Sequence, residues 1–345
     1  MSDGAGTDAR MACSVCGDPM TPADRWCELC GAALSAPSLA TSSADIGERS
    51  SVEASRDDGV SPADSRVERW GGRPGPGLRA KAHDYRELVD GPVAAVTDQG
   101  SSHWRNEDAV GVRWVEGDPG GFALVVCDGV SVSQDPHLVS QAAVDAALHV
   151  LSGAVAEGGD LGAAMAVAAA AAQQAAAAVP YDPTLDVGPG ACTFVAAAVR
   201  GANAAFASVG DSRAYWVDAH GALQIGQDDS LASEMMASGD LTAAQVMDRP
   251  GAHTVTRWLG VDSSDAEPAV TAGELPGPGL VVLMSDGLWT YAPTLEGMAH
   301  LIGPIGSETT ITLARRLVVF ANASGGGDNI TVAVGPHDLD GQERR

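Results

Sequence analysis

Short apolar runs separated by turn residues dominate the chain from about residue 92 to residue 334. Runs of this length, bounded by Gly, Asn and Asp, are typical of β-strands. Two of the runs are joined by Arg200-Gly201-Ala202-Asn203, a connection short enough for a hairpin. We therefore expect strands at 93–97, 122–127, 192–199, 204–209, 214–217, 280–284 and 330–334.

Longer segments with helical spacing or strong helix formers alternate with these strands in blocks. They predict helices at 137–151, 161–179, 295–302 and 307–321. Because the helices do not follow each strand one by one, the order disfavours a doubly wound parallel sheet. It favours an α+β fold in which antiparallel sheets are covered by helices.

The first part of the chain has a different composition, with two C-x-x-C-G motifs close together. Four thiolates at this spacing are typical of a tetrahedral zinc site, although a redox pair or free thiols remain alternatives. A segment this small would depend on the metal for its stability. We expect a zinc-ribbon-like segment at 11–33 that binds a structural Zn²⁺ through Cys13, Cys16, Cys27 and Cys30.

The following stretch is rich in Ser, Ala, Asp, Pro and Gly and lacks apolar periodicity, which is typical of a disordered linker. We place this linker at 34–88, a single folded domain at 89–336 and a tail at 337–345. The Ala-rich run at 162–179 contains Gln173 and Gln174, so we interpret it as a helix of a soluble domain and not as a membrane span.

The charge balance limits the possible partners. With 20 Lys and Arg against 45 Asp and Glu, the formal net charge is −25, so binding to nucleic acid or to anionic membranes is not expected. The polar N-terminus shows no secretory signal, and we expect a cytoplasmic protein whose cysteines stay reduced.

Acidic residues stand at the ends of several predicted strands. Two apolar runs lead into Asp128-Gly129 and Asp286-Gly287, Asp328 follows a run of glycines, and Glu107-Asp108 precedes an apolar segment. A single Asp-Gly pair is usually only a turn. Four such sites in one domain indicate carboxylates that converge on a cation, and oxygen ligands favour Mg²⁺ or Mn²⁺ over Zn²⁺.

The ordered motifs resemble the metal-dependent, type-2C-like (PPM) serine/threonine protein phosphatases of bacteria. The resemblance covers about residues 92–334, and the segments 228–230, 238–242 and 256–260 are similar to the flap region of that family. The motifs are D-x-G at 98–100, N-E-D-A at 106–109, V-x-D-G at 126–129, G-x-x-T-F at 190–194, G-D-S-R-A-Y at 210–215, S-D-G-L at 285–288 and G-D-N-I-T-V at 327–332.

The resemblance implies an antiparallel β-sandwich flanked on both faces by helices, and hydrolysis of phosphoserine and phosphothreonine by a hydroxide that two metal ions activate. The expected partners are phosphoproteins, the substrates of serine/threonine kinases. The resemblance implies roles for particular residues. Asp128 bridges both metals, the Gly129 carbonyl helps to bind the second metal, and Asp286 and Asp328 complete the protein ligands of the first metal. Glu107 and Asp108 orient waters near the second metal, and Asp211 is either a ligand of a third metal or a turn residue.

Two departures from the family pattern concern how substrate is held. His103 replaces the arginine that grips phosphate in many relatives, and either His103 or the nearby Arg105 can take that role. The residues after Asp128-Gly129 are Val130-Ser131-Val132 instead of M-G-G or H-G-G. These changes keep open the alternative of a phosphoprotein-binding regulatory module without turnover, and the zinc segment is a candidate for docking to a protein partner.

Overall fold

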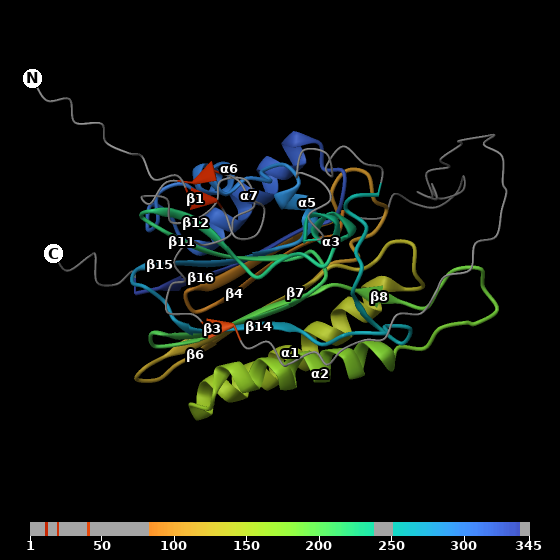
Figure 1. Ribbon diagram of the computed structural model, residues 1–345, viewed down its shortest axis with the longest axis horizontal. Helices are drawn as coiled ribbons and strands as arrows, with labels where there is room; N and C mark the ends of the chain where they lie inside the picture. The colour runs from red at the N-terminus through yellow and green to blue at the C-terminus, as the bar shows by residue number, and fades with distance from the viewer. Residues whose placement is uncertain (1–10, 13–18, 21–39, 42–82, 238–250, 339–345) are drawn as a thin grey trace, which may run out of the picture.

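Two six-stranded sheets pack face to face, and helices cover both outer faces (Figure 1). The computed structural model describes residues 11–12, 19–20, 40–41, 83–237 and 251–338. In spatial order, the first sheet contains β3 (Ala40–Thr41), β14 (Ala269–Glu274), β10 (Asn203–Val209), β9 (Phe194–Arg200), β7 (Gly121–Cys127) and β6 (Ala109–Val115). The second contains β12 (Gly221–Ile225), β11 (Arg213–Asp218), β15 (Gly279–Met284), β16 (Ile330–His337), β5 (Val93–Asp98) and β4 (Tyr85–Asp90). Neighbouring strands in both sheets are antiparallel.

Among the described residues, five helices form the outer layers. α1 (Pro136–Glu157) and α2 (Leu161–Ala177) pack together on the first sheet, whereas α5 (Asp286–Trp289), α6 (Leu295–Ile302) and α7 (Thr310–Ser324) lie on the second. α1 is long and apolar enough to cross a membrane by composition alone, but Val139, Ala143 and Leu151 are buried in the layer between α1 and the first sheet, as in a core helix. Smaller elements are β1 (Met11–Ala12) paired with β2 (Pro19–Met20), β8 (Ala191–Cys192) paired with β13 (Leu259–Gly260), and α3 (Leu231–Ala237).

The alternation of side chains along the central strands explains the four layers. All seven residues of β7 are buried. Leu124 and Val126 belong to the apolar cluster between the two sheets, whereas Val125 and Cys127 belong to the cluster beneath α1 and α2. A strand that is buried on both faces reads as a continuous apolar run, and complete burial of each such side chain contributes about 1.5–3 kcal/mol. A third cluster lies between the second sheet and α5, α6 and α7.

The seven predicted strands and four predicted helices are all present, as are the hairpin between β9 and β10 and the helix-covered antiparallel sandwich. The prediction missed four longer strands, β4, β6, β12 and β14, together with the short elements α3, α5 and β13. The predicted linker boundary at residue 88 needs correction, because β4 begins at Tyr85 and pairs with β5 along its whole length. β3 also falls inside the predicted linker and pairs with β14.

Other predictions for the ends of the chain concern residues that the structure does not describe. Cys13, Cys16, Cys27 and Cys30 lie outside the described residues, so the zinc site stays a prediction. The same holds for most of the predicted linker. At the other end, β16 extends to His337, the first residue of the predicted tail, and residues 339–345 are not described.

Candidate metal centre and active site

Two antiparallel strand pairs, one from each sheet, bring acidic residues to the same end of the sandwich. In the β6–β7 pair Ala109 lies opposite Cys127, so Asp108 and Asp128 leave the sheet side by side. In the β15–β16 pair Met284 lies opposite Val332, which brings Asp286 and Asp328 to the corresponding end of the second sheet. The two pairs of carboxylates lie close together there, and burial, together with the charges of Asp108, Asp286 and Asp328, raises the pKa of Asp128.

Asp108 links the two sheets through hydrogen bonds. Its side chain is only 8% exposed, and its Oδ2 accepts hydrogen bonds from Ser285 Oγ at 2.9 Å and Thr331 Oγ1 at 2.7 Å, both of which belong to the second sheet's side of the site. Burial raises the pKa of Asp108 to about 7, although the two hydroxyl donors oppose the shift. Asp108 Oδ1 is buried and has no hydrogen-bond partner among the described residues.

Asp128 and Asp286 lie within hydrogen-bonding reach of each other through their carboxyl groups. Thr193 Oγ1 fixes the backbone before this point by accepting from the Asp128 N–H at 3.0 Å. Burial raises the pKa of both carboxyls, that of Asp286 to about 6, and the charge of Asp328 adds to each shift. Asp286 Oδ1 is a second buried oxygen that lacks a partner within the described part of the chain.

These groups fit a hard divalent cation. Carboxylates this close repel one another unless a proton or a cation lies between them, and all the available donors are oxygen atoms. The cluster does not form a ready-made coordination sphere, since no three His, Cys, Asp or Glu side chains in the described ranges are placed as ligands of one ion. The fit therefore depends on donor chemistry, on mutual repulsion and on the two unpartnered oxygens.

Glu107 and Asp211 flank this cluster. Glu107 is 9% exposed; its Oε2 accepts a hydrogen bond from Ser131 Oγ at 2.6 Å, and its N–H donates to Asn329 Oδ1 at 2.7 Å. Asp211 is 3% exposed, and its pKa is raised well above the usual range by burial and then by the charge of Asp286. Its backbone carbonyl accepts from Trp289 Nε1 at 2.9 Å, so α5 holds the Asp211 turn in place.

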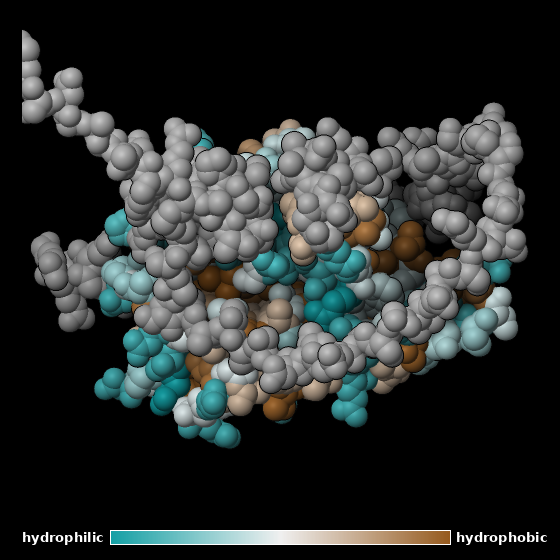
Figure 2. All heavy atoms as spheres, viewed as in Figure 1, coloured by the Kyte–Doolittle hydropathy of each residue, from teal (hydrophilic) through white to brown (hydrophobic). Residues whose placement is uncertain are grey.

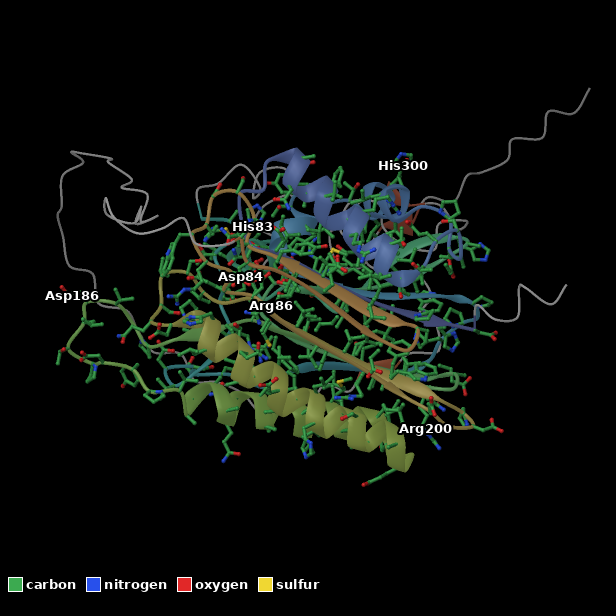
Figure 3. The ribbon with its side chains drawn as sticks, turned by 180° about the vertical axis from the view of Figure 1, so that it is seen from behind. His83, Asp84, Arg86, Asp186, Arg200 and His300 are labelled. Carbon is green, nitrogen blue, oxygen red and sulfur yellow. The ribbon has the colours of Figure 1, made fainter. Side chains whose placement is uncertain are left out.

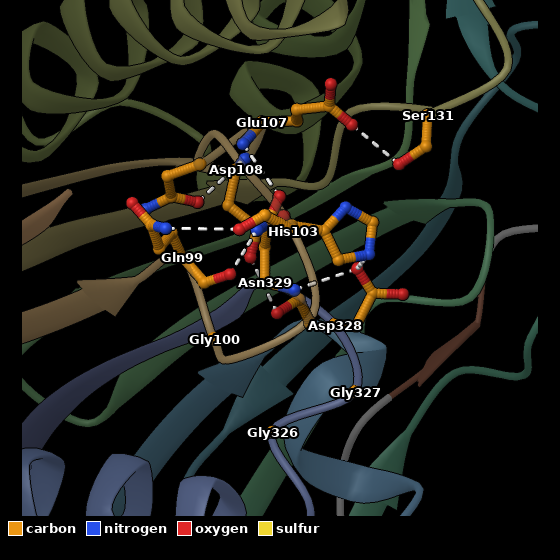
Figure 4. A network of polar contacts seen from close by, with 12 residues as sticks. Gln99, Gly100, His103, Glu107, Asp108, Ser131, Gly326, Gly327, Asp328 and Asn329 are labelled. Atoms are coloured by element: carbon orange, nitrogen blue, oxygen red, sulfur yellow. Dashed lines mark hydrogen bonds and ion pairs between the residues drawn. The ribbon is translucent and has the colours of Figure 1, made fainter. Parts of the chain in front are cut away.

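The loop at 98–105 carries His103 towards Asp328 (Figure 4). Asn329 fixes this loop by donating to the carbonyls of Gln99 at 2.8 Å and Arg105 at 3.0 Å. Gly100 has φ +68°, and a Cβ there would lie 2.0 Å from the Asp328 carbonyl oxygen, so only glycine allows the loop to approach the Asp328 backbone so closely.

His103 and Arg105, the two candidates for binding phosphate, point to different neighbours. His103 Nε2 lies 3.1 Å from Asp328 Oδ1, and this hydrogen bond raises the pKa of His103. Arg105 Nη1 lies 2.7 Å from His137 Nδ1 and 3.6 Å from Asp135 Oδ1, at the start of α1. His103 is thus the residue that faces the carboxylate cluster, whereas Arg105 connects the loop to α1.

The structure brings together the acidic residues that the sequence suggested, namely Asp108, Asp128, Asp211, Asp286 and Asp328, with Glu107 and Gly129 beside them. Their roles at a metal stay predictions. Sequence reasoning missed the neutral residues that hold the acids, above all Ser285, Thr331 and Asn329. Each lies within three residues of a predicted acidic residue, so its position in the same turn is the signal that was available.

Comparison with known proteins places this arrangement in a family. The family model of protein phosphatase 2C matches residues 99–309. The serine/threonine phosphatase stp of Listeria monocytogenes is 32% identical over 150 residues, which make up 43% of this chain and 57% of the relative. The chain thus spans little more than half the length of this curated relative.

Two solved structures share the fold over most of their length. The serine/threonine phosphatase PstP/Ppp of Mycobacterium tuberculosis is 26% identical, with a TM-score of 0.59 over 71% of this chain and 98% of the other. The catalytic domain of PstP, solved in complex with two manganese ions, is 27% identical, with a TM-score of 0.57 and the same two coverages.

Proposed function

Because the chain belongs to the protein phosphatase 2C family, we propose that it hydrolyses phosphoserine and phosphothreonine in proteins with the help of two divalent cations, Mn²⁺ or Mg²⁺. The observation that carries this proposal is the convergence of carboxylates from both sheets, two of which keep a buried oxygen without a partner in the described residues. The names of the relatives and the two manganese ions of the PstP catalytic domain support it.

In this proposal each acidic residue has a place around the metals. Asp128, Asp286, Asp328 and the Gly129 carbonyl would hold the two cations, Glu107 and Asp108 would orient waters beside them, and Asp211 is a candidate ligand for a third. Bound cations would lower the pKa of a bound water and neutralise phosphoryl oxygens.

The protein's own side chains would bind the phosphoryl group and fix the positions of the acidic residues. Protonated His103 can donate from Nδ1 to a phosphoryl oxygen, because its Nε2 lies 3.1 Å from Asp328 Oδ1, and this contact favours the protonated form by raising the pKa of His103. Asp108 is held by two hydroxyl donors from the other sheet, which keeps the position of its free oxygen fixed. The carboxylate side of the site is therefore preorganised before substrate arrives.

The direct test measures turnover of a phosphothreonine peptide and of an aryl phosphate in Mn²⁺. Asp128→Asn should reduce kcat by about a thousandfold, because a group that stabilises the transition state electrostatically is lost, and EDTA should abolish turnover. The matched control is Asp145→Asn on the exposed side of α1, which should leave kcat unchanged. Turnover that survives both EDTA and Asp128→Asn contradicts the proposal, and binding of the phosphopeptide without turnover indicates the regulatory module instead.

We also propose that Cys13, Cys16, Cys27 and Cys30 bind one structural Zn²⁺ and that this segment docks on a protein partner. The support is the spacing of the two C-x-x-C-G motifs. Elemental analysis should find one zinc per chain in the wild type and none in Cys13→Ser/Cys16→Ser. An equal zinc content in both proteins would contradict the site. Removal of residues 1–35 should abolish partner capture while peptide turnover continues.

A further inference from the structure

A loop after α2 lies beside the active-site segment and presents apolar side chains to solvent. Tyr181, Leu185 and Val187 are 43–55% exposed in this loop, and Val132 and Leu138, on the neighbouring segment, are 81% and 49% exposed. We call these five residues the rim surface. Figure 2 shows apolar residues at the surface in both halves of the face it draws, including the right-hand half, the end at which Figure 1 places β8 and the start of α1.

One residue, Gln134, fixes the loop at both of its ends. Its Nε2 donates to the carbonyls of Asp182 at 2.9 Å and Val187 at 2.7 Å, while its Oε1 accepts from the Asp182 N–H at 2.8 Å. The Gln134 N–H also donates to the Gly188 carbonyl at 3.0 Å. The exposed side chains are therefore presented by a loop of fixed shape, which reduces the entropy that a partner would have to offset on binding.

The rim surface is continuous with the catalytic site along the chain. Val132 comes four residues after Asp128, and an extended segment of four residues spans at most about 14 Å. An extended substrate peptide covers the same distance in about four residues. Residues about four positions from a phosphoresidue bound at Asp128 would reach Val132, the part of the rim surface that is nearest to Asp128 along the chain.

The charge around the apolar residues indicates the chemistry of what binds there. The loop alternates apolar and acidic side chains, with Asp182 and Asp186 between Tyr181, Leu185 and Val187. Asp186 stands on the projecting part of the loop (Figure 3). Asp182 accepts hydrogen bonds from the N–H and hydroxyl of Thr184, which hold its pKa below the usual range, so its charge persists at neutral pH.

We propose that the rim surface binds the segment of a phosphoprotein substrate that flanks the phosphoresidue, and that it selects segments with both basic and apolar side chains about four residues away. This inference rests on the proposed phosphatase function. Apolar side chains of the substrate pack on Tyr181, Leu185 and Val187, and its Lys or Arg residues pair with Asp182 and Asp186.

The test compares two phosphothreonine peptides in Mn²⁺ that differ only at the positions four and five residues from the phosphothreonine: Arg and Leu in one, Glu and Ser in the other. The wild type should favour the Arg-Leu peptide by about tenfold in kcat/KM, mostly through KM, as expected when a few partly exposed apolar groups and one ion pair become buried. Tyr181→Ser/Leu185→Ser/Val187→Ser should bring this preference close to one.

The matched control is Val167→Ser/Val319→Ser, which removes two equally exposed apolar residues from α2 and α7, away from the loop. It should keep the full preference. A wild type that treats both peptides alike, or a triple variant that keeps the preference, would overturn the proposal.

The outcome separates this inference from the phosphatase function itself. If the wild type hydrolyses neither the peptides nor an aryl phosphate, the proposed function fails. The rim surface is then tested by fluorescence anisotropy of the labelled Arg-Leu peptide without phosphate. Weaker binding to the triple variant than to the Val167→Ser/Val319→Ser control supports the surface, and equal binding overturns it.

Discussion

The carboxylate cluster and the loop at 98–105 lie at the same end of the sandwich but are held in different ways. Asp128 and Asp286 follow strands whose residues are all buried, and Asp108 accepts hydrogen bonds from Ser285 and Thr331 on the side of the second sheet. The loop is exposed at Ser101 and Trp104 and is fixed mainly by backbone contacts to Asn329. The carboxylates thus belong to the buried end of the sandwich, whereas the loop lies on its surface and is held there by hydrogen bonds.

This difference explains where the sequence departs from its family. A change at Asp108, Asp128 or Asp286 disturbs the contact between the two sheets, and these acidic residues keep the family pattern. A change in the loop disturbs only local contacts, and it is there that His103 replaces the usual arginine. Substitutions near the carboxylates should therefore alter stability as well as activity, while substitution of the loop side chain His103 should alter mainly activity.

The largest effect on stability should come from the backbone next to Asp286. A Cβ at Gly287 would lie 2.0 Å from the Asn329 carbonyl oxygen. Because this oxygen belongs to the backbone, the clash cannot be relieved by rotating a side chain. We expect Gly287→Ala to lower the free energy of unfolding by about 3 kcal/mol. Urea unfolding measures this change.

The control for that measurement is Gly153→Ala in α1, where a Cβ meets nothing within 4 Å. Alanine should raise the free energy of unfolding there by up to about 1 kcal/mol, because it is the better helix former. Equal effects of the two substitutions would show that the end of the second sheet next to Asp286 is not rigid.

A smaller effect should appear in the pH dependence of stability of the metal-free protein. The folded-state pKa values of Asp286 and Asp108 are raised, to about 6 and about 7. A raised pKa favours the protonated folded state, so this stability is present below the unfolded pKa near 4 and is lost as pH rises through 6 to 7. For Asp286 the raised pKa corresponds to a loss of unfolding free energy on the order of 3 kcal/mol, and the remaining contact of this side chain with solvent reduces the loss.

Thermal unfolding in EDTA from pH 4 to pH 8 measures this loss, and Asp286→Asn should flatten the profile. The pair of His103 and Asp328 changes stability in the same direction, since the pKa of His103 is also raised: its contribution is present below about pH 6.5 and is lost at higher pH. Because Asp328 is 44% exposed, that contribution is small, and His103→Gln should leave the profile almost unchanged. A profile flattened by His103→Gln and not by Asp286→Asn would reverse the comparison.

How far the sequence could predict the fold follows from the same contrast between core and edge. The seven strands found as apolar runs include the central strands of both sheets. The missed strands β4, β6 and β12 lie at the edges of the sheets, and the missed β14 has only the two-residue strand β3 on its outer side. An edge strand such as β4 has only half-buried or exposed residues, so it lacks a continuous apolar run. β4 forms because it pairs with β5, and the sequence pattern within β4 does not predict that pairing.

The candidate site shows the same limit. The acidic residues could be found because each follows or precedes a strand in a short motif. The partners of Asp108 could not, because Ser285 and Thr331 lie 177 and 223 residues away in the sequence and meet it only when the two sheets pack. The opposite orientations of His103 and Arg105 also depend on tertiary contacts, with Asp328 and with the start of α1.

Ser131 connects the two kinds of region and should give the smallest effect. It lies in the exposed segment after Gly129, at a position where relatives carry glycine, yet its Oγ donates to Glu107 Oε2 at 2.6 Å. A hydrogen bond of this kind contributes about 0.5–1.5 kcal/mol, so Ser131→Ala should weaken Mn²⁺ binding about two- to tenfold, as Glu107 loses its fixed orientation.

Calorimetric titration with Mn²⁺ measures this change. Ser152→Ala in α1, where Oγ donates to the Leu148 carbonyl, should leave the affinity unchanged. An unchanged affinity in Ser131→Ala would mean that the core alone orients Glu107, through its backbone bonds to Asn329 and Ser140, and that the exposed segment adds nothing to the metal side of the site.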